Sequence, residues 1–187
     1  MILRLIDKIV SLPAEYISNA MNIPLSSALL EQATLERGEQ GYTDTVIHAV
    51  SEAAGGEITA QTLQQLSTSQ LTLLAFDVLK REVDEGGFIQ LIHNGWGPFF
   101  FHNPFAKVMK MWGLRELAQL VYDASRLYAR YADELTAEMD DDTFMALYET
   151  HPAFDELDDT FIDQGDTYVH QLATYIKDHL SDFVTLE

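Results

Sequence analysis

The chain has 187 residues, of which 47% are hydrophobic, and it carries a formal charge of −19 at pH 7. This length can bury a substantial core, and the apolar content argues against general disorder. The absence of cysteine excludes disulfides and cysteine-ligated metal sites, and it favours a cytoplasmic location. No uncharged apolar run reaches the ~18 residues of a membrane-spanning helix. We therefore expect no membrane association.

The negative charge is concentrated in the last third of the chain. Residues 1–130 carry 14 acids and 10 bases, whereas residues 131–187 carry 16 acids and one base, Lys177. A surface of this sign repels nucleic acid and attracts basic partners, and the attraction weakens with salt. The simpler alternative is that the acidic surface only keeps the protein in solution.

Apolar residues recur at intervals of three and four residues, which is the helical period, along most of the chain. We predict helices over residues 2–10, 13–20, 26–37, 43–53, 68–85, 88–94, 104–112 and 114–131. Ser26 or Ser27 and the run Ser67-Thr68-Ser69 offer helix caps, Gly38 and Gly55-Gly56 are suitable helix ends, and a turn is expected from Thr59 to Leu66. No convincing alternating pattern requires a sheet. The sequence therefore predicts an all-α fold, a compact multi-helix bundle.

The segment Gly86-Gly87-Phe88 interrupts one of these helices, because two glycines let the backbone leave helical geometry. We expect the amide side chains of Gln90 and Asn94 to satisfy the backbone groups freed at this corner. A dense aromatic block follows between Trp96 and Phe105. We interpret it as a hydrophobic plug that fixes the corner; the alternative is a ligand pocket.

The acidic region from Asp133 to Asp166 is interleaved with apolar residues at helical spacing, which indicates a folded acidic face and not a tail. Asp166-Thr167 can cap a last helix that carries an apolar stripe from Tyr168 to Phe183. An exposed remainder of this stripe would allow a homodimer contact.

The glycine corner resembles a pattern of a known bacterial family. The family pattern is roughly Glu-Val-x-Asn-Gly-Gly-Phe-x-Gln-aromatic-aromatic-x-Asn-x-x-Gly. Matching residues here are Glu82, Val83, Gly86, Gly87, Phe88, Gln90, Asn94 and Gly97. Glu85 stands where the family has Asn, and Leu91 and Ile92 replace the aromatic pair. The family is of unknown function and is named after an all-helical acidic DNA-mimic protein; the resemblance spans about residues 67–185.

The resemblance and the charge distribution together imply a non-enzymatic binding protein without a cofactor. Its acidic face would occupy the basic surface of a DNA-binding protein such as a transcription regulator. The expected partner-binding residues are Glu138, Asp140, Asp141, Asp142, Glu149, Asp155, Glu156, Asp158, Asp159, Asp163 and Asp166; the expected structural motif is Gly86, Gly87, Phe88, Gln90, Asn94 and Gly97. Residues 1–56 are expected to form a helical extension of a domain over residues 57–187.

Two other functions stay open at this point. One is an enzyme or metal-binding protein that uses a pocket near Gly86–Trp96, with scattered histidines as ligands. The other is an acidic helical protein whose interaction surface is unrelated to DNA. A calcium loop starting at Asp140 is excluded, because Phe144 and Met145 stand where an oxygen ligand and glycine are needed.

Overall fold

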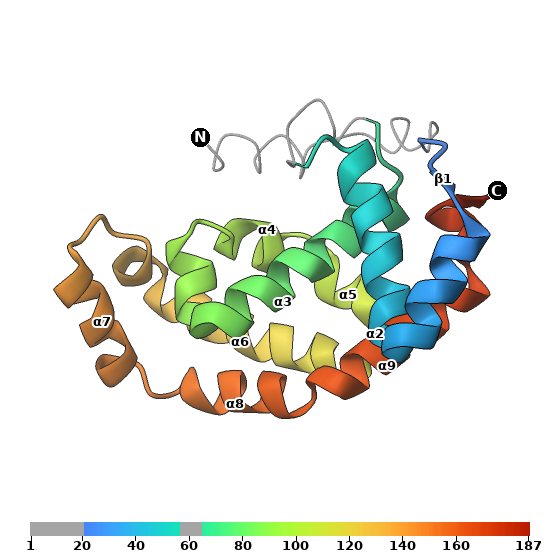
Figure 1. The fold of residues 1–187 in the computed structure, drawn as a ribbon. Coiled ribbons are helices and arrows are strands. Elements are labelled where there is room, and N and C mark those ends of the chain that lie inside the picture. Colours follow the sequence, from blue (N-terminus) through green and yellow to red (C-terminus); the bar gives the residue numbers. More distant parts are fainter. Residues whose placement is uncertain (1–20, 57–64) are drawn as a thin grey trace. The chain divides into compact units, whose positions relative to one another are not determined.

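The computed structural model describes residues 21–56 and 65–187 (Figure 1). In these ranges the chain forms β1 (Pro24–Leu25), α2 (Ser27–Ala53), α3 (Thr68–His93), α4 (Gly97–His102), α5 (Phe105–Met111), α6 (Arg115–Leu135), α7 (Asp141–Thr150), α8 (Asp155–Asp163), α9 (Gly165–Asp178), the 3-10 helix η3 (Leu180–Asp182) and β2 (Thr185–Leu186). The all-α prediction is confirmed. The helices expected over residues 2–10 and 13–20, and most of the turn from Thr59 to Leu66, lie outside the described residues.

The described residues form two compact units. One combines the chain up to Asp77 with residues Asp166–Glu187, and the other contains Val78–Gly165. Helix α3 contributes to both units, since the division falls within it.

In the first unit, α2 contains the break predicted at Gly38. Gly38 has φ 60° and ψ −140° inside an otherwise helical segment, and Ser26 caps the helix by accepting a hydrogen bond from the Leu29 amide. Gly41, after the break, lies close to the first half of α2. A Cβ at this position would collide with the Ala33 carbonyl group. The helix ends at the predicted glycine pair, where Gly55 and Gly56 both have positive φ.

The same unit joins α2 to α9 through one carboxylate. Glu39 accepts hydrogen bonds from His170 and, at 3.1 Å, from Lys177, and these bonds hold the pKa of Glu39 below its ordinary value. Lys177 also lies 5.4 Å from the centre of the Tyr42 ring. The one base of residues 131–187 is therefore used inside its own unit.

A short strand pair, which the sequence did not predict, joins residues near the two ends of the described chain. Leu25 of β1 pairs in parallel with Leu186 of β2. Nearby, Ser67 and Gln70 form a reciprocal capping box at the start of α3. The Gln70 amide also donates to the Phe183 carbonyl at 3.0 Å, which ties α3 to the C-terminal segment.

The apolar stripe of α9 is buried. Its buried residues are Tyr168, Val169, Leu172, Ala173 and Ile176, and Phe183 is also fully buried. The stripe therefore packs inside the chain, and the homodimer contact expected from it stays a prediction.

In the second unit, α4 and α5 pack on α6. Asn103 accepts a hydrogen bond from the Phe105 amide at 2.8 Å at the predicted start of α5, and Gly113, with φ 96°, separates α5 from α6. Helix α6 is strongly amphipathic and buries one face, including Leu117, Val121 and Ala124. This scaffold carries the glycine corner and the acidic helices.

Candidate functional site

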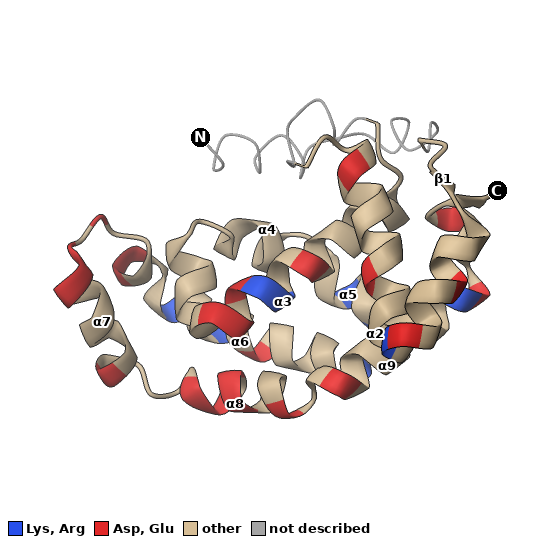
Figure 2. Cartoon of the chain, viewed as in Figure 1, with Lys and Arg blue, Asp and Glu red and all other residues tan. Residues whose placement is uncertain are grey.

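The acidic region folds into the two short helices α7 and α8 and the loops beside them. Ten of the eleven carboxylates expected on the partner-binding face are exposed: Glu138, Asp140, Asp141, Asp142, Glu149, Asp155, Glu156, Asp159, Asp163 and Asp166. Figure 2 shows acidic residues along α7 and α8 and no Lys or Arg on either helix. All but Asp166 lie in the second unit. Their role in binding stays a prediction.

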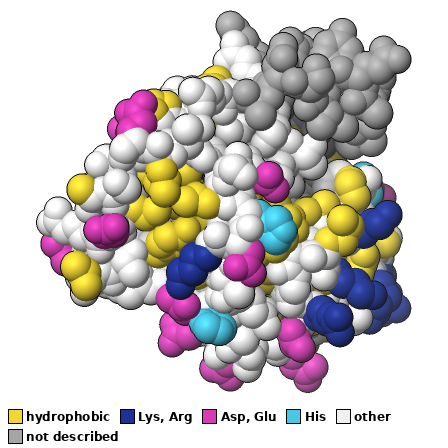
Figure 3. Space-filling model, turned by 90° about the vertical axis from the view of Figure 1, so that its right-hand side faces the viewer, with side chains coloured by type: hydrophobic (Ala, Val, Ile, Leu, Met, Phe, Trp, Pro, Cys, Tyr) yellow, Lys and Arg dark blue, Asp and Glu magenta, His cyan; other side chains and the backbone are white. Residues whose placement is uncertain are grey.

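A different face of the molecule lacks this concentration of charge. In Figure 3, Asp and Glu side chains are interspersed with hydrophobic side chains and with Lys and Arg, and they form no continuous acidic surface. The exposed carboxylates of the acidic region are concentrated on α7 and α8.

Helix N-termini help the fold to hold many carboxylates in a short segment. Asp140 caps α7 by accepting a hydrogen bond from the Thr143 amide at 2.9 Å. The Thr143 side chain and, to a smaller extent, this amide lower the pKa of Asp140. Asp141 and Asp142 lie in the first turn of α7, and α8 also begins with acidic residues. The positive end of the helix dipole favours negative side chains at these positions.

Asp158 differs from the other ten carboxylates because it lies on the inner side of α8. It shares the helical spacing of Phe154, Leu157 and Phe161, of which the two phenylalanines are buried. Its Oδ1 accepts a hydrogen bond from the backbone N–H of Phe88 at 2.8 Å. Asp158 is only half-buried, yet its carboxylate is directed at the glycine corner.

The corner has backbone geometry that requires glycine at one position. Gly87 has φ 69° and ψ −174°, a region that is essentially restricted to glycine. A Cβ on Gly87 would lie 2.6 Å from Cγ of Asp158, and a Cβ on Gly86 would lie 2.6 Å from Cδ of Gln90. The Asp158 carboxylate occupies the space in which a side chain at residue 87 would lie.

The second free backbone group of the corner is satisfied from α7. The Tyr148 hydroxyl donates to the Gly86 carbonyl oxygen at 2.9 Å. The prediction that Gln90 and Asn94 satisfy these groups is therefore wrong, since Asp158 takes the Phe88 N–H and Tyr148 takes the Gly86 carbonyl. Both partners lie far along the chain, on the two acidic helices.

Asn94 instead helps a carboxylate to bridge the two arms of α3. Glu82 accepts a hydrogen bond from Asn94 Nδ2 at 2.7 Å and another from Trp96 Nε1 at 3.2 Å. Glu82 precedes the break, whereas Asn94 and Trp96 follow it. One carboxylate thus fixes the bend in the chain.

Three rings of the aromatic block are buried in the interior, and its role as a plug that fixes the corner stays a prediction. Phe99, Phe100 and Phe105 are buried, and successive ring pairs meet edge to face with centroids 5.1 and 5.0 Å apart. Gly97 is required for close packing, because a Cβ there would lie 2.6 Å from the Tyr128 ring. These residues serve the core.

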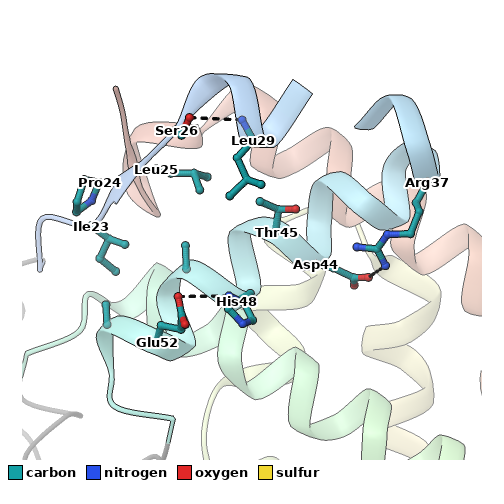
Figure 4. Close-up of a pocket in the computed structure, with 12 residues that line it drawn as sticks. Ile23, Pro24, Leu25, Ser26, Leu29, Arg37, Asp44, Thr45, His48 and Glu52 are labelled. Carbon is teal, nitrogen blue, oxygen red and sulfur yellow. Dashed lines mark hydrogen bonds and ion pairs between the residues drawn. The ribbon is translucent and has the colours of Figure 1, made fainter. Parts of the chain in front are cut away.

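A pocket of about 650 Å³ lies in the other unit, in a place that the sequence did not indicate (Figure 4). It lies between the start of α2, with Leu25 and Leu29, and later turns of the same helix. Arg37 pairs with Asp44 at 2.8 Å, and His48 Nδ1 lies 3.5 Å from a carboxylate oxygen of Glu52.

Residues 21–56 and 65–187 contain neither a cluster of metal ligands nor a helix that could span a membrane. No group of three or more His, Asp or Glu side chains in these ranges could hold a metal ion. Across the same ranges, every helix is too short or too polar to cross a bilayer.

Asp158 is expected to make the free energy of unfolding depend on pH. Burial raises its pKa to about 6 from an ordinary value of 3.8; the Phe88 hydrogen bond opposes this rise, and the negative charges of Asp155 and Asp159 add to it. A carboxyl with a higher pKa in the folded than in the unfolded state stabilises the fold below the unfolded value, and the contribution is lost as the pH rises through the folded value. The neutral variant Asp158→Asn lacks this dependence.

We expect the wild-type protein to gain about 2 kcal/mol relative to Asp158→Asn between pH 7 and pH 4, after allowance for partial exposure. Urea unfolding of both proteins at several pH values measures this difference, and the other carboxylates titrate in both and cancel. A difference independent of pH contradicts the raised pKa.

Comparison with known proteins places these observations in a family. The family described as DMP19-like protein matches residues 64–179, which include the glycine corner and both acidic helices. The chain is similar to the DNA mimic protein DMP19 of Neisseria meningitidis serogroup B (strain ATCC BAA-335 / MC58), with 32% identity over 132 residues, 68% of this chain and 80% of the relative. The chain therefore belongs to the DMP19-like protein family.

Proposed function

We propose that this chain is a non-enzymatic DNA mimic whose acidic helices α7 and α8 occupy the basic surface of a DNA-binding protein, such as a transcription regulator. The observation that carries the proposal is the row of exposed carboxylates on α7 and α8, in a stretch without Lys or Arg from residue 131 to 176. The name of the Neisseria relative supports it. An acidic surface without opposing bases attracts a cationic surface over a Debye length.

The spacing on α8 suits this function. Asp155, Asp159 and Asp163 are exposed and follow one another at four-residue intervals, which corresponds to a rise of about 6 Å between successive carboxylates. Phosphates of one B-DNA strand rise ~3.4 Å per nucleotide. The row therefore presents negative charge at about the spacing of every second phosphate.

Competition with duplex DNA tests the proposal. We expect the immobilised chain to capture a DNA-binding protein from an extract of the source cell at low salt, and duplex DNA to release it. With the captured protein purified, its affinity for the chain is expected to fall about tenfold or more between 50 and 200 mM salt, because the contacts are ionic.

The control is the same titration with an uncharged competitor of similar size, which is expected to release nothing. A captured protein that binds the duplex and the chain at the same time contradicts mimicry, as does an affinity that is insensitive to salt.

A further inference from the structure

We propose that the Gly86-Gly87-Phe88 corner is a docking point for α7 and α8, in which Tyr148 and Asp158 are positioning residues that set the acidic helices and do not contact the partner. This inference rests on the proposed function only for the statement that α7 and α8 bind the partner. The docking itself is a property of the folded chain.

The corner exposes two backbone groups that a continuous helix would use internally. The φ and ψ angles of Gly86 and Gly87 are not helical, and the Phe88 N–H and the Gly86 carbonyl both bond to side chains from outside α3. One side chain comes from each acidic helix: Asp158 of α8 lies 70 residues away in sequence and Tyr148 of α7 lies 62 residues away.

The fit around Asp158 is steric as well as polar. The carboxylate lies where a side chain at residue 87 would stand, and its acceptor oxygen is 2.8 Å from the Phe88 nitrogen. Directly beneath this contact, the Phe88 and Phe161 rings meet edge to face at 6.3 Å, and both are buried. A polar and an apolar contact thus join the same turn of α8 to the corner.

Docking of Asp158 leaves the opposite face of α8 free. Asp155, Asp159 and Asp163 are exposed. On a helix, Asp159 and Asp163 lie on a side away from residues 154, 157 and 161, whereas Asp155 lies at the edge of that side, three residues before Asp158. A rotation of α8 that broke the Asp158 contact would also turn this row. Asp158 is therefore expected to influence binding through the orientation of its neighbours.

Amide hydrogen exchange of the full chain tests the docking without any partner. In Asp158→Ala, the Phe88 amide and the α8 amides are expected to exchange at least about tenfold faster than in wild type, while the α9 amides in the other unit stay unchanged. Asp158→Asn keeps an acceptor oxygen and is expected to restore the protection. Tyr148→Phe is expected to accelerate the α7 amides about threefold and to spare α8.

Unchanged Phe88 exchange in Asp158→Ala overturns the proposal, and so does an Asp158→Asn variant that exchanges as fast as Asp158→Ala. If Asp158→Ala does not fold, Asp158→Asn and Tyr148→Phe still decide, because both conserve size: loss of Phe88 protection in Asp158→Asn, or unchanged α7 exchange in Tyr148→Phe, contradicts docking.

A deca-arginine peptide serves as the probe of the exposed charges. Asp159→Asn is expected to weaken peptide binding about twofold, whereas Asp158→Asn is expected to leave it unchanged. Equal weakening by both variants would show that Asp158 belongs to the exposed face and would overturn its positioning role. Both readouts stand even if no DNA-binding partner exists, so failure of the proposed function is distinguishable from failure of this inference.

Discussion

Gly87→Ala is expected to lower the free energy of unfolding by about 3 kcal/mol or more. The alanine must adopt φ 69° and ψ −174°, which costs about 1–3 kcal/mol for a residue with a side chain. Its Cβ also enters the space of the Asp158 carboxylate, so the hydrogen bond to Phe88 is lost; bonds to charged groups contribute about 1.5–3 kcal/mol. Both penalties act at one position.

Gly95→Ala is the matched control. Gly95 also has positive φ, 88°, but a Cβ there meets nothing within 4 Å. Only the conformational cost of about 1–2 kcal/mol is expected. Urea unfolding at pH 7 measures both variants, and equal losses would contradict the close fit of Asp158 against Gly87.

Most helices could be predicted because the helical spacing of the apolar residues stops or shifts where glycines allow the backbone to turn. Gly38, Gly87 and Gly113 take non-helical angles at the places where the apolar period changes. The β1–β2 pair could not be predicted, because two-residue strands carry no alternation and their pairing joins Leu25 to Leu186. Such a contact depends on the fold as a whole.

Charge and spacing named the eleven carboxylates of the expected acidic face, and their role in binding stays a prediction. The structure sets Asp158 apart from the other ten, because it lies on the inner side of α8. Asp158 was grouped with its acidic neighbours by sign alone, whereas its spacing from Phe154 and Phe161 already indicates the inner face. The sequence predicts partners for the glycine corner nearby, at Gln90 and Asn94, whereas the structure supplies Asp158 and Tyr148. Long-range partners such as Tyr148 leave no local signal in a single sequence.

The second large effect is expected from the exposed row on α8. We expect the triple variant Asp155→Asn, Asp159→Asn, Asp163→Asn to bind the DNA-displaceable partner at least about tenfold more weakly than wild type, because contacts between complementary charges set much of such an affinity. The side chains are exposed, so the fold should tolerate amides of the same shape. Loss of like-charge repulsion between neighbours four residues apart should stabilise α8 slightly.

The matched control removes the same charge elsewhere. Glu31→Gln, Glu36→Gln, Glu116→Gln also changes the net charge from −19 to −16, and all three residues are exposed and lie outside α7 and α8. If only the net charge mattered, both triple variants would bind the partner equally weakly. If the partner binds the acidic surface of α7 and α8, only the α8 variant binds more weakly than wild type.

The measurement that tests the central claim most directly is the affinity of the purified partner for wild type and both triple variants at one low salt concentration. The proposed function predicts a loss of at least about tenfold for the α8 variant and less than about twofold for the control variant. Equal affinities for the two triple variants would contradict an α7–α8 surface that takes the place of DNA.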